Sequence, residues 1–233
     1  MAVQAALRRV FEQWGLPKRM RVDNGAPWAT WADLPPAFAL WLIGLGIKMI
    51  WNHPHCPKEN ANVERCNGLI GTWGDPASCA DDPAWRCQVA RVVRVQREEY
   101  RPAAGGLTRQ ERFPQLARNE RRYAADEEAR QFDIGRVKEH LAQGRWPRLV
   151  SKIGQITLYG QAYRVGRKWQ GEQVWLRFDA VTTEWVVADR EGKELVRHAA
   201  EQITAERICE LRVAHPRPPS KKKRQNSHAP PPT

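Results

Sequence analysis

The side chains best suited to chemistry lie in two short segments of the chain, residues 21–25 and residues 53–65. The first reads Arg-Val-Asp-Asn-Gly and the second reads His-Pro-His-Cys-Pro-Lys-Glu-Asn-Ala-Asn-Val-Glu-Arg. Carboxylate oxygens suit hard divalent cations, whereas imidazole and thiolate groups suit zinc. The histidines and cysteines that could form a zinc cluster follow no standard ligand spacing, so zinc is disfavoured. They are His53, His55, Cys56 and Cys66.

The Asp23-Asn24-Gly25 tripeptide taken alone is typical of a turn, because Asn-Gly favours tight-turn backbone conformations. It comes after residues 19–22, which predict a strand, so Asp23 is expected at the carboxyl end of that strand. Residues 60–73 predict a helix opened by polar capping side chains, which places Glu64 in its first or second turn. The sequence therefore offers one carboxylate at a strand end and another on a helix.

Taken together, the two segments resemble the second half of the Asp-Asp-Glu (DDE) catalytic core of integrase-like transposases of bacterial insertion sequences. These transposases share the retroviral integrase catalytic core superfamily, in which a D-N-G turn precedes a proline-rich loop and an N-G-x-x-E-R helix. Here 40 residues separate Asp23 from Glu64. The resemblance covers most of the chain, since residues 41–47 fit the core's helix and last strand and residues 100–108 fit the exit from the helix after the core.

The resemblance implies roles for individual residues. Asp23 takes the place of the second catalytic aspartate and Glu64 that of the catalytic glutamate, so both are expected to bind Mg²⁺ or Mn²⁺ in a two-metal site. Two such ions about 3.5–4 Å apart clamp the attacking and leaving oxygens of a phosphodiester. Asn60 and Arg65 are expected to contact the DNA. The implied activity is metal-dependent DNA cleavage and strand transfer, as in DNA transposition, integration and recombination.

One feature of the family is missing from this sequence. The first catalytic aspartate of the family lies on the first strand of the sheet, upstream of the helix that corresponds to residues 2–14. Glu12, within that helix, is the single acidic residue before Asp23. We therefore expect a partial RNase H-like core, truncated at its N-terminus and inactive alone. Two strands are marginally stable in water, so exposed apolar edge surface is also expected.

The rest of the chain predicts the elements that must position these groups. Apolar residues at helical spacing predict further helices, and these cover residues 2–14, 35–45 and 83–100. Residues 46–51 predict a second strand, and a strand, helix, strand order indicates an α/β layer. Residues 101–149 contain several prolines and mixed charge, which indicates a connector, with a helix over 124–142.

Residues 150–203 differ in character, because β-branched and aromatic residues fall in about five short runs separated by turn residues. This pattern predicts a small all-β barrel that looks like the one after the core in such transposases. Its Trp169, Trp175 and Trp185 are expected to fill the interior in preference to stacking on bases. The expected domains are the core 1–102, the connector 103–149, the barrel 150–204 and a disordered Pro-rich tail 205–233.

The positive charge of the chain is concentrated at its end. The formal net charge is +12, and residues 211–233 hold six Lys and Arg and no acidic residue, so they carry half of it. Clustered basic side chains attract phosphate backbones. Lys221, Lys222, Lys223 and Arg224 are therefore expected to grip DNA, although such a run is also compatible with a localisation signal or a solubilising tail.

The partners and location that we expect depend on these features. The partners are DNA, at transposon ends and target, and a second copy or a full-length transposase. No run approaches the roughly 20 apolar residues of a membrane span, and the first residues do not form a signal peptide. A cytoplasmic, nucleoid-associated protein is expected. The alternative function is a non-catalytic remnant that binds DNA or interacts with a transposase.

Overall fold

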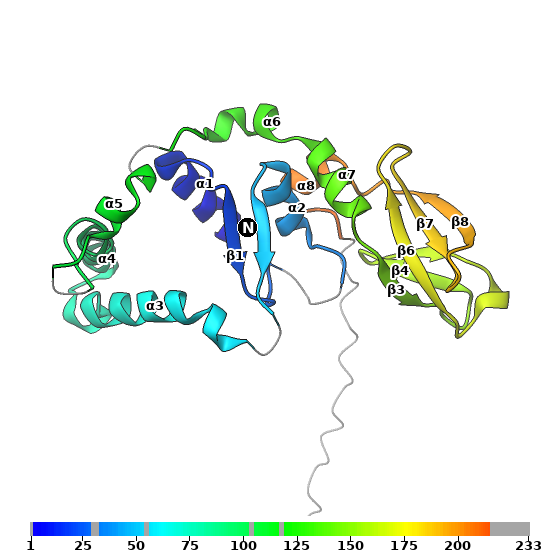
Figure 1. Cartoon of the computed structure of the whole chain (residues 1–233), viewed down its shortest axis with the longest axis horizontal. Helices are drawn as coiled ribbons and strands as arrows, with labels where there is room; N and C mark the ends of the chain where they lie inside the picture. The colour runs from blue at the N-terminus through cyan, green and yellow to red at the C-terminus, as the bar shows by residue number, and fades with distance from the viewer. Residues whose placement is uncertain (1, 29–32, 54–55, 103–104, 117–118, 215–233) are drawn as a thin grey trace, which may run out of the picture.

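A computed structural model describes residues 2–28, 33–53, 56–102, 105–116 and 119–214 (Figure 1). The fold is mixed α/β, with most helices in the first part of the chain and most strands in the last. The first elements are α1 (Ala2–Trp14), β1 (Arg19–Val22), α2 (Ala37–Gly44), β2 (Lys48–Trp51), α3 (Ala61–Trp73), α4 (Asp82–Glu98), α5 (Arg109–Arg112) and the 3₁₀ turns η1 (Pro57–Glu59), η2 (Pro76–Ser78) and η3 (Pro114–Leu116).

The second part of the chain carries the remaining elements. Its helices are α6 (Glu128–Gln131), α7 (Ile134–Ala142) and α8 (Ala205–Cys209), with the 3₁₀ turns η4 (Ala125–Glu127) and η5 (Arg167–Trp169). Its strands are β3 (Trp146–Leu149), β4 (Gln155–Leu158), β5 (Gln161–Arg164), β6 (Gln173–Asp179), β7 (Glu184–Ala188) and β8 (Glu194–Ala199).

At the centre of the molecule, β1 and β2 form a two-stranded parallel sheet. Arg19 pairs with Lys48 and Val22 pairs with Trp51, and α2 lies between the two strands in the chain. The expected strand over 19–22 is confirmed, and the second expected strand begins two residues later than residue 46. The expected α/β layer is confirmed as well. Among the described residues no further strand pairs with β1 or β2, so both strands are sheet edges.

The helix α2 is the hydrophobic centre of the fold. Seven of its eight residues are buried, and no charged side chain interrupts it. Pro36 precedes its first turn, and the helix ends before Gly46, whose positive φ of 74° suits glycine. Trp41 packs against Phe11 of α1 at a ring-centroid distance of 6.1 Å and against Phe38 at 5.6 Å. Burial of these side chains supplies much of the stabilisation of the sheet's covered face.

We call α3, α4 and α5 the helical arm, which projects away from the β1–β2 sheet (Figure 1). Its helices have clear local signals: Asp81 caps α4 by accepting from the Ala84 N–H at 2.8 Å, and Thr108 with Glu111 forms a capping box at α5. The expected helices over 60–73 and 83–100 are confirmed within two residues. Burial is sparse, since α3 has no buried residue and α4 buries only Val92 and Gln96.

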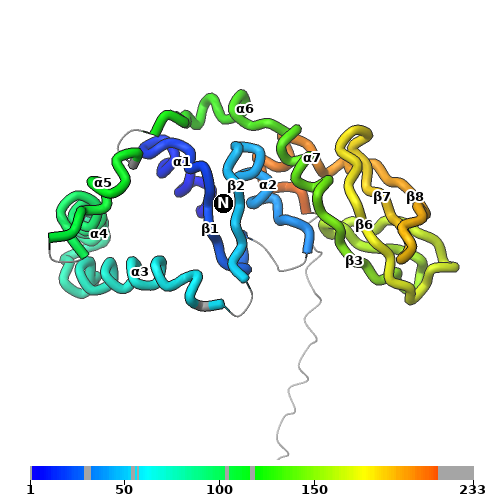
Figure 2. The backbone as a smooth tube through the Cα atoms, in the orientation of Figure 1, coloured from blue at the N-terminus to red at the C-terminus, as the bar shows by residue number. Residues whose placement is uncertain are grey.

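Residues 119–142 return from the arm across α1 to the other end of the molecule (Figure 2). The single helix expected over 124–142 is wrong, because the segment breaks at Phe132 and Asp133 into α6 and α7. The Asp133 side chain accepts from the Gly135 N–H at 2.8 Å and so begins a new helix. Phe132 packs so tightly on Gly44 that a Cβ there would lie 2.1 Å from its ring.

The last part of the chain contains the β region, residues 146–199. The strands β3, β6, β7 and β8 form an antiparallel sheet in that order, and β4 and β5 form a separate hairpin. The expected series of short strands within 150–203 is confirmed by β4 to β8. The described strands of the β region form two sheets, and no ladder of hydrogen bonds closes them into a barrel, so the closed barrel that the sequence predicts is not found in this part of the chain. Trp185 is fully buried in this region, while Trp169 and Trp175 are half-buried.

The expected start of the disordered tail at residue 205 is wrong. Residues 205–214 are folded, with Ile208 and Val213 fully buried. The Thr204 side chain caps α8 by accepting from the Arg207 N–H at 3.3 Å. The Gln4 side-chain amide of α1 donates to the Cys209 carbonyl at 2.8 Å. The folded part of the chain therefore extends through residue 214, because apolar side chains after residue 204 pack into the core.

The buried residues of the α/β layer and of the β region belong to one continuous hydrophobic cluster. Polar contacts also connect the β region to the segment before α2. The Tyr159 hydroxyl donates to the Pro35 carbonyl at 2.8 Å, and Arg148 forms an ion pair with Asp33. Within the described ranges, every helix is too short or too polar to cross a membrane.

Candidate functional site

The candidate site lies at the carboxyl ends of β1 and β2, where the chain leaves the sheet. Asp23 comes directly after β1 and is exposed. Its carboxylate accepts a hydrogen bond from the Gly25 N–H at 3.2 Å, which is the local turn geometry expected for Asp-Asn-Gly. The structure therefore places Asp23 at a strand end, as the sequence predicts.

Asn52, the residue after β2, is the centre of a polar network at this edge. It is only 4% exposed. Its side-chain amide donates to Asn60 Oδ1 at 2.5 Å, and its Oδ1 accepts from Arg21 Nη1 at 3.3 Å. Its carbonyl accepts from the Asn24 side-chain amide at 2.9 Å. One buried amide thus connects β1, the turn after it, β2 and the start of α3.

Glu59 supplies a second connection at the same edge. Its carboxylate lies 3.3 Å from Arg21 Nη1 and accepts from the His53 N–H at 2.8 Å, and it also lies 3.0 Å from His53 Nδ1. Hydrogen bonds from the His53 ring and backbone lower the pKa of Glu59 below its usual value. Glu59 is therefore held as an anion between β1 and the loop that leads to α3.

The helix α3 starts from this network and carries Glu64. The Glu64 N–H donates to the Asn60 carbonyl at 3.0 Å, so Glu64 lies one turn into the helix. Its side chain is exposed, as is that of Arg65, and neither forms a side-chain hydrogen bond or ion pair with the described residues. Asn60, half-buried, already uses its side-chain oxygen on Asn52.

The donor set does not amount to a metal site by itself. Asp23 and Glu64 provide the oxygen ligands that Mg²⁺ prefers. Among the described residues, however, no group of three or more His, Cys, Asp or Glu side chains converges on one point. Of the residues considered for zinc, His53 contacts Glu59, Cys66 contacts Gln96 at 3.4 Å, and His55 lies outside the described residues.

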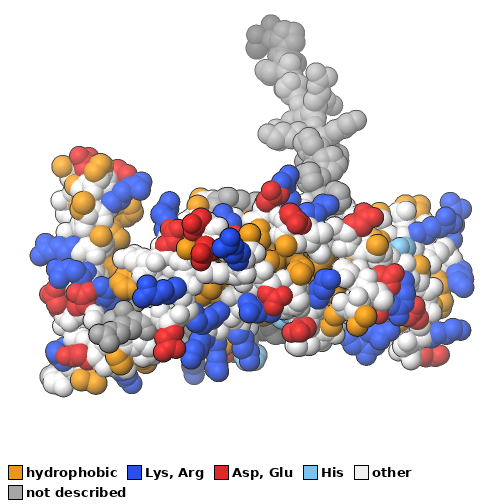
Figure 3. Space-filling model, turned by 90° about the horizontal axis from the view of Figure 1, so that it is seen from above, with side chains coloured by type: hydrophobic (Ala, Val, Ile, Leu, Met, Phe, Trp, Pro, Cys, Tyr) orange, Lys and Arg blue, Asp and Glu red, His pale blue; other side chains and the backbone are white. Residues whose placement is uncertain are grey.

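A basic surface lies on one face of the sheet, from the amino ends of β1 and β2 to Arg21. Arg19 and Lys48 are paired in register on neighbouring strands, and Arg21 is the next residue on the same face of the sheet. All three side chains are exposed. On the face seen in Figure 3, Lys and Arg side chains are mixed with Asp and Glu. Arg19 and Lys48 give this face positive charge that attracts phosphate groups, while the charge of Arg21 is partly balanced by its ion pair with Glu59.

Sequence reasoning finds Asp23, Asn60, Glu64 and Arg65 but misses the residues that hold the edge together. Asn52 lies in neither motif segment, and its one signal is that a polar residue comes after a predicted strand. Glu59 lies within the segment 53–65, but the resemblance assigns it no role. Arg19, Arg21 and Lys48 alternate with apolar residues, a pattern that indicates an exposed strand face. The predicted DNA-gripping residues Lys221, Lys222, Lys223 and Arg224 lie outside the described residues.

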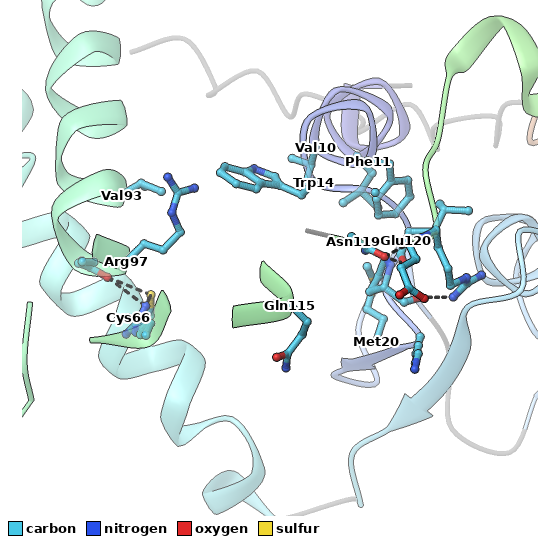
Figure 4. A pocket seen from close by; sticks show the side chains of 18 of the residues that line it. Val10, Phe11, Trp14, Met20, Cys66, Val93, Arg97, Gln115, Asn119 and Glu120 are labelled. Carbon is cyan, nitrogen blue, oxygen red and sulfur yellow. Dashed lines mark hydrogen bonds between the residues drawn. The ribbon is translucent and has the colours of Figure 1, made fainter. Parts of the chain in front are cut away.

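A large hollow separates α1 and β1 from the helical arm, with a volume of about 1000 Å³. We call it the arm hollow. Figure 4 shows Trp14 of α1 and Arg97 of α4 pointing toward one another across it, and the Arg97 guanidinium carbon lies 4.1 Å from the Trp14 ring centroid. The walls are mainly apolar, and they include Leu7, Val10, Trp14, Met20, Ile70 and Val93.

No model of a known protein family matches this chain. The class of the protein therefore rests on the residues and their arrangement.

Proposed function

We propose that this chain is part of a transposase- or integrase-type protein that acts in DNA transposition by metal-dependent phosphodiester cleavage and strand transfer. The observation that carries the proposal is the arrangement at the carboxyl edge of β1 and β2. Asp23 leaves β1 there, and the Asn52 network fastens the start of the Glu64 helix to the same edge. The motif resemblance in residues 21–25 and 53–65 supports the same class.

The proposed architecture rests on the same resemblance. In it, α1, β1, α2, β2 and α3 form the second half of an RNase H-like core, and the β region corresponds to the small barrel that comes after such cores. Asp23 and Glu64 are then catalytic metal ligands for Mg²⁺ or Mn²⁺. Since two carboxylates do not complete the set, a further carboxylate must come from outside these residues, so the chain is inactive alone.

DNA contacts in this proposal come from three places. Arg19, Arg21 and Lys48 offer a cationic face beside the site, and Asn60 and Arg65 lie at the start of α3. The Lys-rich end of the chain adds further positive charge, with Lys221 to Arg224 in one run of the sequence. Backbone contacts of this kind position DNA without reading its sequence.

Binding and catalysis are tested with the whole 233-residue chain and a short DNA duplex. We expect salt-sensitive binding, and replacement of Lys221, Lys222, Lys223 and Arg224 by alanine should reduce the slope of log affinity against log salt by up to about 4. We expect no Mg²⁺-dependent nicking or strand transfer. Absence of DNA binding at low salt would overturn the proposed class.

Activity in the unmodified chain would contradict only the incompleteness of the site. The nicking or strand transfer would be attributed to the proposed carboxylates if Glu64→Gln abolished the activity. The control substitution Glu139→Gln, at an exposed position on α7, should leave the activity unchanged. Activity that survives Glu64→Gln would contradict the assigned role of Glu64.

A second candidate function is a non-catalytic DNA-binding or transposase-interacting module. The finding that favours it is the lack of a three-ligand carboxylate group among the described residues. Loss of DNA binding on deletion of 215–233, with binding unchanged in Asp23→Asn, would support this candidate. The deletion starts at residue 215 because Val213 is buried in the core.

A further inference from the structure

The charge of the β region is divided unevenly along its sequence. Residues 145–171 contain six Lys and Arg and no Asp or Glu, whereas residues 172–194 contain six Asp and Glu and three Lys and Arg. Three of those acidic side chains, Asp179, Glu184 and Glu194, form ion pairs with Arg197. The acidic part of the β region is therefore largely neutralised within the fold, and the basic part has no acidic residue of its own.

The fold brings four of the six basic side chains to one end of the β region. The turn 151–154 lies against the chain after β5, because the Val165 N–H donates to the Gly154 carbonyl at 2.8 Å. A Cβ on Gly154 would lie 2.6 Å from the Arg167 backbone nitrogen. Gln155, the next residue, pairs with Arg164 across the β4–β5 hairpin. We call this surface the basic end, and its cations are Lys152, Arg164, Arg167 and Lys168.

The positive charge of the basic end is not balanced within the described part of the chain. All four side chains are exposed, and none of them forms an ion pair or a side-chain hydrogen bond with a described residue. Arg148, by contrast, is paired with Asp33. The Lys168 ammonium lies 5.6 Å from the centroid of the Trp169 ring. Like charges close together repel one another, so the basic end favours an anionic partner.

Exposed apolar side chains lie beside these cations. Leu149, at the end of β3, is 70% exposed, and Ile153, in the turn 151–154, is 61% exposed. Trp169 in η5 is half-buried. Apolar surface of this kind is stabilised when apolar side chains of a partner cover it, because burial removes it from water. The basic end therefore favours a partner that combines negative charge with apolar side chains.

We infer that the basic end is a docking site for an acidic segment of another protein, in which apolar side chains lie between the carboxylates. Clusters of arginine recognise acidic motifs, and a guanidinium can bind a carboxylate through two parallel hydrogen bonds. The carboxylates of the segment pair with Arg164 and Arg167, and its apolar side chains cover Leu149 and Ile153. This interaction involves neither Asp23 nor Glu64, and it does not rest on the proposed function.

Two other occupants fit less well. The phosphate backbone of duplex DNA would satisfy the cations, but it offers no apolar side chains to cover Leu149 and Ile153. A second copy of the chain would have to supply acidic side chains, and three of those in its β region are already paired with Arg197. Residues 215–233 contain Lys and Arg but no Asp or Glu, so they would be repelled.

Binding is first measured with the whole chain and two fluorescently labelled peptides of equal negative charge. One peptide has leucine and phenylalanine between its glutamates, and the other has serine at the same positions. The basic residues 215–233 attract both peptides through charge alone, so a difference between the peptides reports the apolar contact. We expect the apolar acidic peptide to bind about tenfold tighter. Equal affinities would overturn the inference.

A pair of double variants tests whether the peptide binds at the basic end. Lys152→Glu with Arg167→Glu reverses two of its cations, and Arg190→Glu with Lys193→Glu makes the same change in net charge elsewhere in the β region. All four side chains are exposed, so circular dichroism should show both variants folded. We expect the first pair to weaken binding of the apolar acidic peptide about tenfold and the control pair about twofold at most. Equal weakening would place the peptide elsewhere on the protein and exclude the proposed site.

A third comparison separates a protein partner from DNA. Leu149→Ser and Ile153→Ser should each weaken peptide binding about threefold and leave the affinity for a short DNA duplex unchanged. The control is Val181→Ser, because Val181 is 93% exposed in the turn between β6 and β7. If the two substitutions leave peptide binding unchanged while the charge reversal at Lys152 and Arg167 weakens DNA binding tenfold, the basic end is a nucleic-acid surface and the inference is wrong.

Sedimentation of the free protein tests the remaining occupant. We expect the charge reversal at Lys152 and Arg167 to leave the sedimentation coefficient unchanged. If the unmodified chain self-associates and this double variant does not, the basic end belongs to a second copy, and a separate partner is ruled out.

Discussion

Two helices flank the same two-stranded sheet, and their environments are opposite. Seven of the eight residues of α2 are buried, whereas α3, with thirteen residues, buries none. Both helices were expected from local sequence patterns, and both form. Helix formation and helix burial are therefore separate questions in this protein, because local signals decide the first and the surroundings decide the second.

The arm is held together mainly by polar contacts at its ends. The Trp85 indole N–H donates to the Gly74 carbonyl at 2.8 Å, and the Gln88 amide donates to the Trp73 carbonyl at 3.0 Å. Trp73 and Tyr100 add an edge-to-face contact at 5.3 Å. The α2 side instead has closely packed aromatic rings. The arm therefore depends more on polar contacts than α2 does.

The largest expected effect is on the free energy of unfolding, and it is seen by comparing a substitution in α2 with one in α3. Trp41→Ala removes a fully buried indole from α2 and should lower the free energy of unfolding by about 3–5 kcal/mol. Ile70→Ala in α3 removes a half-buried side chain beside the hollow and should cost less than about 1 kcal/mol. Urea unfolding monitored by circular dichroism measures both. Equal losses would show that α3 is as tightly packed as α2.

An intermediate effect is expected at the anchor of α1. Glu128 accepts from Arg8 Nη2 at 2.6 Å and from the Tyr123 hydroxyl, with side-chain exposures of 33% for Arg8 and 7% for Glu128. Burial opposes ionisation of Glu128, but these hydrogen bonds outweigh it and lower its pKa. Glu128→Gln should therefore cost about 1–3 kcal/mol.

The neighbouring Glu127 provides the matched control for this anchor. It is exposed, so Glu127→Gln should change the free energy of unfolding by no more than about 0.5 kcal/mol. If the two variants unfold at the same urea concentration, the ion pair between Arg8 and Glu128 contributes nothing to the stability of the protein.

The smallest expected effect is a pH dependence of stability that comes from His140. His140 of α7 lies against Trp51 of β2, with ring centroids 6.0 Å apart, and burial lowers its pKa below 6.5. The unfolded chain then takes up a proton at a higher pH than the folded chain. Stability is therefore full above pH 6.5 and falls as the pH drops toward the lower folded pKa.

Urea unfolding at a series of pH values tests this sign. The part of the decline that His140 causes should disappear in His140→Gln, while hydrogen exchange in α3 should not respond to the substitution. An increase of stability on acidification over this range would contradict the stated direction.

Much of the local structure could be predicted from sequence. The strand over 19–22 and the helix that carries Glu64 were identified from local patterns. The expected polar cap of that helix is wrong, because the side chain of its N-cap residue Asn60 accepts from Asn52 and makes no capping hydrogen bond. The break at Asp133 was missed; it combines a local signal, the Asp133 side-chain cap, with the packing of Phe132 against Gly44. The boundary of the tail was missed because Ile208 and Val213 are buried against residues distant in the chain.

The candidate site divides in the same way. The sequence by itself determined that Asp23 ends a strand and that Glu64 lies in the first turns of a helix, because turn and helix propensities act over a few residues. Only the tertiary structure decided that Asn52 joins these two elements and that the arm stands apart from the sheet. Those outcomes depend on contacts between residues far apart in the chain, for which no local pattern exists.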